Sequence, residues 1–313
     1  MKRISAAAVA LSLASASCAV SPPSPEGFVF GVMGDTPYTA GEEPRFVEMI
    51  GRMNAEPLAF VIHVGDIKAG GNSRCTDELY AKRLAQFNAS RHPLIYTPGD
   101  NEWTDCRRRT NGGDDPLERL ARIREVFFKG RTTLGLATFD TAGEGAAGDC
   151  GAYPENRAWA YRRVRFDTIN VPGDDNNEGI DERLDAEARC RNEANERWID
   201  AAAAKAEQEG DRALVIATQA DPWHNAKTRE FHVLIAKVAE VARRLGRPVL
   251  FVHGDTHVYR WDAPFRDRYG EPVPNALRLE VYGSPFVGWV RVTVDPDSPG
   301  VFIVEPKLVA IKP

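Results

Sequence analysis

The chain has 313 residues, of which 43% are hydrophobic and 27% are charged, and its formal net charge is −5. This length is enough for one large α/β domain or two smaller ones, each with its own core. The negative net charge argues against a surface that generally binds nucleic acid or anionic membranes. A local basic patch could still bind either of them.

Residues 1–18 are typical of an export signal, with Lys2 and Arg3 before a short apolar stretch and small residues at the expected cleavage site. The apolar stretch, Ala6–Ala16, is too short to span a bilayer, and no later segment reaches the required length. We therefore predict a periplasmic or secreted protein with no transmembrane segment. The sequence "SASC" before Ala19 loosely resembles a lipoprotein processing site, so a lipid anchor at Cys18 is the alternative to a free protein.

A proline-rich tether over 19–27 precedes residues 28–313, in which strand-like and helix-like segments alternate. Strands are predicted at Phe28–Met33, Leu58–Val64, Leu94–Thr97, Leu214–Thr218 and Val249–Val252. Helices are predicted at Pro44–Asn54, Asp77–Ala89, Pro116–Phe128, Asp181–Gln208 and Thr228–Leu245, with Thr76 as an N-cap and Gly143–Asn156 as a long loop. This alternation favours parallel βαβ units.

Two further stretches, Ala158–Val171 and Gly288–Asp295, alternate apolar and polar residues, which is typical of antiparallel strands with one solvated face. We therefore expect residues 28–313 to form a single domain of the α/β class, built on two sheets with both parallel and antiparallel strands.

Four cysteines remain after Cys18, and an even number in an exported chain predicts two disulfides. Cys75 and Cys106 each follow a Gly-Asp pair at a similar distance, so we expect them to pair if those strand ends are neighbours. Cys150 and Cys190 then form the second bond. Zinc ligation is the alternative, and the wide spacing of the cysteines argues against it.

Four of the apolar runs end at a Gly-Asp pair, which places Asp35, Asp66, Asp100 and Asp255 directly after predicted strands. Ligands of open α/β sheets bind beyond the carboxyl ends of the strands. If the four strands lie side by side, glycine provides the sharp exit from each strand and the four carboxylates converge. Two carboxylates about 4 Å apart repel by roughly 4 kcal/mol at an effective dielectric constant near 20. Such a cluster requires protons or cations, and a divalent metal ion is the simplest solution at neutral pH; widely spaced or hydrogen-bonded aspartates are the alternative.

The segments "GDTPY", "GDIKAGG", "GDNEW" and "GDTH", in this order, resemble the motif series of the calcineurin-like metallophosphoesterases. That family has Asp-x-His, Gly-Asp, Gly-Asn-His-Asp/Glu, a later His, and Gly-His-x-His. The resemblance extends from Phe28 to about Val294, and "RVRFDTINVPGDDNN" and "NEANERWIDAAAAKA" are similar to the family's central strand and following helix. It implies a two-sheet β-sandwich flanked by helices and metal-dependent hydrolysis of phosphoesters.

Four of the five motifs depart from the family pattern. Pro37 replaces the His of the first motif, Asn101 replaces the His that assists departure of the leaving group, and Gln219 stands where a ligand His belongs. In addition, Asp100 replaces a ligand Asn, and Asp255 replaces the first His of the last motif. The carboxylates partly compensate for the lost imidazoles in charge.

The resemblance implies a set of metal ligands: Asp35, Asp66, Asp100, Gln219, Asp255 and His257. Because most of these donors are oxygens, we expect Mn²⁺, Mg²⁺ or Ca²⁺ in preference to Zn²⁺ or Fe, as one or two ions. Asn101 and Glu102 are the candidate catalytic residues, with Glu102 as the replacement acid, and Lys68 and Arg107 are candidates for binding the phosphate of a small ligand. The alternative function is that of a catalytically impaired relative that binds a phosphorylated or anionic ligand.

Overall fold

The structure is a computed structural model that describes residues 26–143, 150–224 and 228–310. The predicted export signal, Cys18 and most of the tether lie outside the described residues. No helix in the described ranges is long and apolar enough to cross a membrane.

The first sheet has five strands in the order β12-β11-β1-β2-β3. Their bounds are β1 Phe28–Met33, β2 Val61–His63, β3 Leu94–Tyr96, β11 Gly288–Val294 and β12 Phe302–Leu308. Strands β1, β2 and β3 are parallel, and β11 pairs with β1 in the antiparallel sense. The carboxyl ends of the three parallel strands therefore meet at one edge of the sheet.

The second sheet has seven strands in the order β4-β5-β6-β7-β8-β10-β9. Their bounds are β4 Ala142–Gly143, β5 Arg157–Tyr161, β6 Val164–Thr168, β7 Ala213–Ala217, β8 Val249–His253, β9 Arg260–Asp262 and β10 Ala276–Glu280. Strands β6, β7, β8 and β10 are parallel, and the outer pairs are antiparallel. Both sheets are therefore mixed, as predicted.

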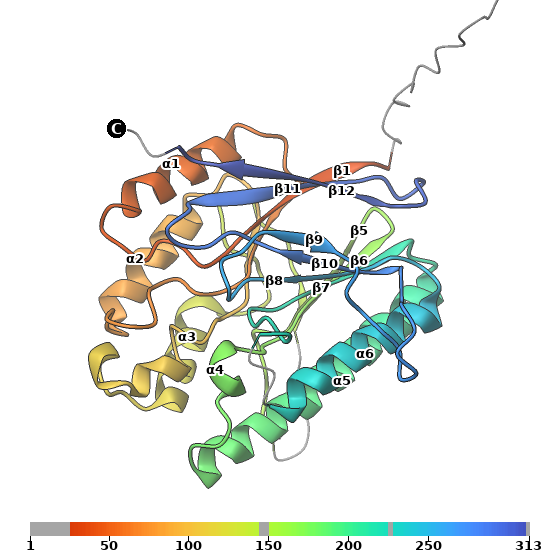
Figure 1. Ribbon diagram of the computed structural model, residues 1–313. Helices are drawn as coiled ribbons and strands as arrows, with labels where there is room; N and C mark the ends of the chain where they lie inside the picture. The colour runs from red at the N-terminus through yellow and green to blue at the C-terminus, as the bar shows by residue number, and fades with distance from the viewer. Residues whose placement is uncertain (1–25, 144–149, 225–227, 311–313) are drawn as a thin grey trace, which may run out of the picture.

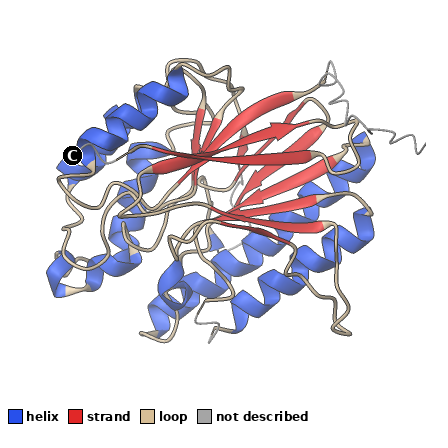
Figure 2. Ribbon diagram, turned by 45° about the horizontal axis from the view of Figure 1, so that its top comes forward, coloured by secondary structure: helices blue, strands red, loops and turns tan. Residues whose placement is uncertain are grey.

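Helices cover the two outer faces of the stacked sheets, as Figures 1 and 2 show. Helices α1 Glu43–Asn54, α2 Asp77–Asn88 and α3 Pro116–Phe127 pack on the first sheet, and α5 Glu182–Glu209 and α6 Arg229–Leu245 pack on the second. Short segments complete the order: the 3₁₀ helices η1 Thr104–Arg107 and η2 Arg109–Asn111, and α4 Gly173–Asn176. Thr76 and Pro116 occupy the predicted start positions of α2 and α3.

The core between the sheets is built from alternate residues of the strands. In β1, Phe28, Phe30 and Val32 face the second sheet, whereas Met33 packs under the helices of the first sheet. The ring of Phe60, just before β2, lies 4.9 Å from that of Phe166 in β6, so aromatic contacts join the two sheets directly. This explains why the predicted strands are apolar on both faces: each is covered by a sheet on one side and by helices on the other.

The stretch Ala158–Val171 is not one strand but a hairpin, in which β5 and β6 are joined at Arg162 and Arg163, both with positive φ. The short strands β9 and β10 and the edge strand β12 were not predicted, because their alternating charged residues weaken the apolar signal. The two predicted disulfides, Cys75–Cys106 and Cys150–Cys190, are both present, with Cα–Cα distances of 5.8 and 5.3 Å.

Candidate functional site

The aspartates that follow the apolar runs gather where the two sheets meet. Asp35, Asp66 and Asp100 follow β1, β2 and β3, which are neighbours in the first sheet, but Asp255 follows β8 of the second sheet. The expectation of four strands side by side was therefore wrong, although the aspartates still converge. The backbone N–H of Asp255 donates to Asp35 Oδ1 at 2.9 Å and so bridges the two groups. We call Asp35, Asp66, Asp100 and Asp255 the carboxylate cage.

At three of the four motifs the aspartate itself adopts the left-handed conformation at the strand exit. Asp35, Asp66 and Asp255 have φ values of 51°, 59° and 82°, in the left-handed region. Of the four preceding glycines, only Gly65 has a positive φ. The sequence argument that glycine provides the turn was thus wrong at three of the four motifs. Aspartate tolerates the left-handed conformation better than most residues, at a cost of about 1–2 kcal/mol.

The glycines instead leave room for carboxylates of neighbouring motifs. A Cβ atom on Gly254 would lie 2.0 Å from Asp35 Oδ2, and one on Gly99 would lie 2.1 Å from Asp66 Oδ1. A Cβ on Gly173 would lie 2.8 Å from Asp100 Oδ1 and 2.9 Å from Asp255 Oδ1. Each carboxylate of the cage therefore rests on a backbone without a side chain, which allows the motifs to approach so closely.

Burial and mutual repulsion disfavour the charged state of the cage. Burial raises the pKa of Asp35, Asp66 and Asp100 well above the ordinary value of an aspartate, and neighbouring carboxylates add to each shift. Burial also raises the pKa of Asp255, although its hydrogen bond from the Asp221 N–H acts in the opposite direction. The cage therefore favours the protonated state more than exposed aspartates do, and a cation would relieve the same repulsion.

Two oxygens of the cage point to a cation. Asp35 Oδ2 and Asp100 Oδ1 are buried and have no hydrogen-bond partner among the described residues. Buried carboxylate oxygens normally accept hydrogen bonds, so an unpartnered pair inside a cluster of like charge is costly. Oxygen-rich clusters of this kind fit a divalent metal ion such as Mn²⁺, Mg²⁺ or Ca²⁺.

His257 lies beside the cage in the arrangement that a metal ligand needs. Its Nδ1–H donates to the carbonyl oxygen of Ser284 at 2.8 Å, which leaves the lone pair on Nε2. Nε2 lies 3.8 Å from Asp35 Oδ1. Gln219 is also present, but its amide oxygen accepts from Gly173 N–H at 2.6 Å and its Nε2 donates to Asp255 at 3.3 Å.

Asn101 and Glu102 hold the loops of the cage together. The amide of Asn101 donates to Asp66 Oδ2 at 2.8 Å and to the hydroxyl of Tyr38, also at 2.8 Å. Glu102 is fully buried and accepts hydrogen bonds from Asp66 N–H, Ile67 N–H, Gly99 N–H and the hydroxyl of Tyr96. These contacts give Glu102 four donors within the protein.

Tyr38 was missed in the sequence, although it stands three residues after Asp35 in "GDTPY". Its hydroxyl donates to Asp66 Oδ2 at 2.9 Å, and its ring lies edge-on to His257 with centroids 5.2 Å apart. Tyr38 therefore contacts residues of both sheets at the cage.

A cavity of about 290 Å³ opens over Asp100 and Asp255 and is also lined by Arg108 and His224. Lys68 Nζ is turned away to the carbonyl oxygens of Ala69 and Asn101, at 2.9 and 2.6 Å. Arg107 pairs with Asp174. Arg108, rather than the predicted Arg107, is thus the arginine that lines the cavity. The phosphate-binding roles of Lys68 and Arg107 stay predictions.

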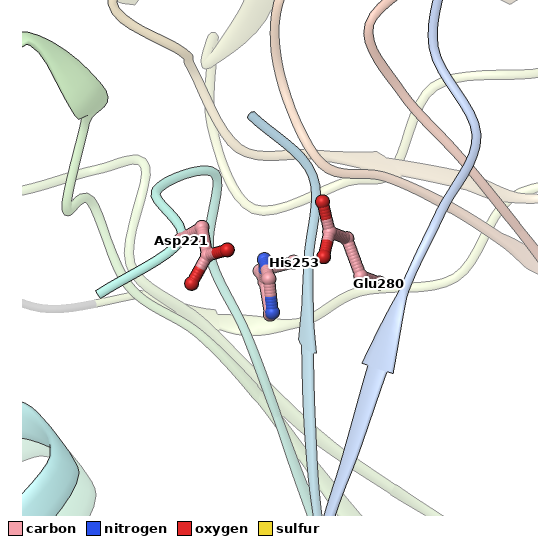
Figure 3. Close-up of side chains that lie close together, drawn as sticks. All are labelled: Asp221, His253 and Glu280. Atoms are coloured by element: carbon pink, nitrogen blue, oxygen red, sulfur yellow. The ribbon is translucent and has the colours of Figure 1, made fainter. Parts of the chain in front are cut away.

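A second group of side chains lies beside the cage, at the carboxyl ends of neighbouring strands of the second sheet. Asp221, His253 and Glu280 each offer a ligand atom within 4.8 Å of those of the other two, and all three are buried. Figure 3 shows the imidazole standing between the two carboxylates. Within the described ranges, no three of the predicted carboxylate and imidazole ligands come together as tightly.

His253 directly follows the predicted strand Val249–Val252, and its ring packs near Phe251 and Trp223. The signal that could have identified this trio is positional. His253 directly precedes the Gly-Asp of the last motif, Asp221 lies two residues after Gln219, and Glu280 ends the run "ALRLE".

No protein family and no curated protein matches the sequence. Solved structures do match. A dimetal phosphatase from Danio rerio is 13% identical, with a TM-score of 0.52 over 90% of this chain and 99% of that chain. This chain has a metallophosphoesterase-like fold. GAP50, the anchor in the inner membrane complex of Plasmodium, is 9% identical, with a TM-score of 0.50 over 91% of this chain and 90% of that chain. At such low identity the likeness concerns the fold alone.

Proposed function

We propose that this chain is an exported, metal-dependent phosphoesterase that hydrolyses phosphate mono- or diesters at the carboxylate cage. The observation that carries the proposal is the pair of buried, unpartnered oxygens of Asp35 and Asp100 inside a cluster of like charge. The fold shared with a protein described as a dimetal phosphatase supports it. Export is supported by the two disulfides, which persist in oxidising compartments.

In this proposal Asp35, Asp66, Asp100, Asp255 and His257 hold the metal. A divalent ion held there would supply positive charge that acidifies water and neutralises the oxygens of a phosphoryl group. Ser284 keeps the Nε2 lone pair of His257 available, and Asn101 fixes the orientation of Asp66. Gln219 orients Asp255 through its amide N–H.

Arg108 lines the cavity and pairs with Asp105 and Asp174, so a substrate phosphate would bind there by replacing these carboxylates at the guanidinium. Glu102, with its four donors, is better suited to holding the loops than to donating a proton to a leaving group, so we assign it the positioning role. Because Asn101 has no proton to give at neutral pH, we expect turnover to be fastest on esters with good leaving groups.

Hydrolysis of p-nitrophenyl phosphate and of its bis ester tests the proposal, in the presence of Mn²⁺, Mg²⁺ or Ca²⁺. We expect Asp66→Ala to lower the metal-dependent rate by at least about 100-fold. The exposed carboxylate Glu125 provides a matched control, because its side chain is 66% exposed. Glu125→Ala is expected to keep the full rate.

The rival function is binding of a phosphorylated or anionic ligand without turnover. The hydrogen bonds of Asn101 and Gln219 within the protein favour it, because both side chains stand where the family has imidazoles. A native chain that hydrolyses no faster than Asp66→Ala with any of these ions would decide for the rival.

A further inference from the structure

The group formed by Asp221, His253 and Glu280 has the chemistry of a cation site. The three side chains come from the segments that follow β7, end β8 and end β10, which are adjacent in the second sheet. Glu280 and His253 are paired in register across β10 and β8, so they lie on the same face. Figure 3 shows both carboxylates directed toward the imidazole.

The tautomer of His253 leaves the lone pair of one ring nitrogen, Nε2, without a partner in the described part of the chain. Its Nδ1 lies 2.9 Å from the carbonyl oxygen of Gly254, and since a carbonyl only accepts, Nδ1 carries the proton. Nε2 is buried and has no hydrogen-bond partner among the described residues. A histidine that donates one N–H to a backbone carbonyl and keeps the other nitrogen free is oriented as metal ligands commonly are.

Arg260, at the start of β9, is the positively charged partner of the two carboxylates. Its guanidinium pairs with Glu280 and lies 3.5 Å from Asp221 Oδ2. The hydroxyl of Thr256 also donates to Glu280. The side chain of Arg260 is 35% exposed, whereas those of Asp221 and Glu280 are 4% and 0% exposed. Arg260 thus stands between the buried trio and solvent, and it can withdraw without moving a strand.

We propose that Asp221, His253 and Glu280 form a second divalent-cation site, distinct from the carboxylate cage, at which an incoming ion displaces the guanidinium of Arg260. One imidazole and two carboxylates suit a borderline ion such as Zn²⁺ or Co²⁺ better than the proposed cage site does, where four carboxylates accompany the single imidazole of His257. Arg278, which pairs with Asp262, is another arginine near the trio, and a divalent ion would bring the two carboxylates more positive charge than Arg260 does.

The second site is adjacent to the cage. The backbone N–H of Asp221 donates to Asp255 Oδ2 at 3.0 Å, so the segment that carries one ligand of the trio also holds a residue of the cage. An experiment must therefore separate the two sites, and Asp66 is suited to this because it lies on the first sheet, away from the trio.

The test uses the full chain with Asp66→Ala to disable the cage, and measures Co²⁺ and Zn²⁺ bound per chain by equilibrium dialysis and elemental analysis. The visible absorption of bound Co²⁺ reports nitrogen coordination. We expect one ion per chain in Asp66→Ala. Adding His253→Phe or Glu280→Gln should abolish that ion, and adding Arg260→Met should tighten its binding about tenfold, equivalent to about 1.4 kcal/mol. Arg291→Met is the matched control, since this arginine is 23% exposed and pairs with acids in the other sheet.

Three outcomes would overturn the inference: no Co²⁺ or Zn²⁺ bound by Asp66→Ala, binding unchanged by both His253→Phe and Glu280→Gln, or binding weakened by Arg260→Met. Thermal unfolding of each variant identifies any that fail to fold, and the two ligand variants provide independent readings. None of these measurements uses hydrolysis, so a failure here is distinct from a failure of the proposed phosphoesterase activity.

Discussion

The buried aspartates of the cage make the metal-free protein sensitive to pH. Burial, followed by repulsion from nearby carboxylates, raises the pKa of Asp35, Asp66 and Asp100 in the folded state. In the unfolded chain an aspartate has a pKa of about 3.9. The folded protein therefore binds more protons than the unfolded chain between about pH 4 and the raised values, and stability must decrease as pH rises through this window.

We expect the free energy of unfolding of the metal-free protein, measured in urea, to decrease as pH rises from about 4, because each folded aspartate must lose a proton that it holds tightly. Asp100→Asn should reduce the slope, whereas Asn in place of the exposed Asp140 should leave it unchanged. Saturating Mn²⁺ should flatten the dependence. Stability that instead rises with pH in the absence of metal would contradict the clustering of these carboxylates.

The glycines that contact the cage are predicted to be intolerant of a larger side chain. Gly254→Ala places a methyl group 2.0 Å from Asp35 Oδ2, so the carboxylate must move. We expect this variant to lose about 1–3 kcal/mol of stability, as overpacking does, and to bind metal more weakly. Gly71→Ala is the control, because a Cβ there meets nothing within 4 Å. Equal metal affinity in the two variants would exclude a role for Asp35 in binding.

At the level of elements, the disulfide Cys75–Cys106 ties the segment before α2 to η1, which directly precedes Arg108. The two cysteines are 31 residues apart, and closing a loop of this size stabilises a protein by about 3–4 kcal/mol in the chain-entropy description. The bond therefore contributes to stability and also fixes the position of a residue that lines the cavity.

Replacing Cys75 and Cys106 together by Ala should lower stability by about 3–4 kcal/mol and weaken inorganic phosphate binding. The matched pair is Cys150 and Cys190, whose separation of 40 residues gives a similar loop. Replacing that pair by Ala should destabilise the protein comparably and leave phosphate binding unchanged. Calorimetric titration with phosphate distinguishes the two, and a similar loss of affinity in both would show that the effect is one of general stability.

The elements also show where sequence reasoning reaches its limit. Strand β1, the N-cap of α2 at Thr76 and the start of α3 at Pro116 were predicted correctly, because periodicity and capping are local properties. Membership of a sheet is not local. Nothing within "VLFVHGD" indicates that β8 lies in the second sheet, because strands covered on both faces read alike in either sheet.

The same difference between local and long-range information explains which residues of the candidate site could be predicted. The aspartates of the cage were found because each follows an apolar run. The trio of Asp221, His253 and Glu280 was missed, because Glu280 ends a strand whose arginine at Arg278 hides its apolar character. Its members become neighbours only through the pairing of β7, β8 and β10.

At the scale of the whole molecule, the two sheets share a core between them, in addition to the cluster that each forms with its own helices. Phe60 contacts aromatic rings of both sheets, among them Phe30 at 5.4 Å and Trp159 at 5.5 Å. Residues of the cage likewise come from both sheets. Loss of packing between the sheets must therefore disturb the site as well.

We expect differential scanning calorimetry to show one cooperative transition for residues 28–313, because neither sheet can keep its inner face buried alone. Phe60→Ala should lower stability by about 3–5 kcal/mol while preserving the single transition. Two resolved transitions, in the native chain or in this variant, would show that the sheets are separate cooperative units.

The left-handed backbone conformation of three cage aspartates limits the substitutions that the protein can accept during evolution. At Asp35, Asp66 and Asp255 the backbone is best suited by aspartate, asparagine or glycine. Glutamate would keep the negative charge but strain the chain, whereas asparagine would keep the chain and remove the charge. Asparagine substitutions can thus remove the negative charges one position at a time while the shape of the backbone is preserved, so a descendant without these charges would still fold like its parent.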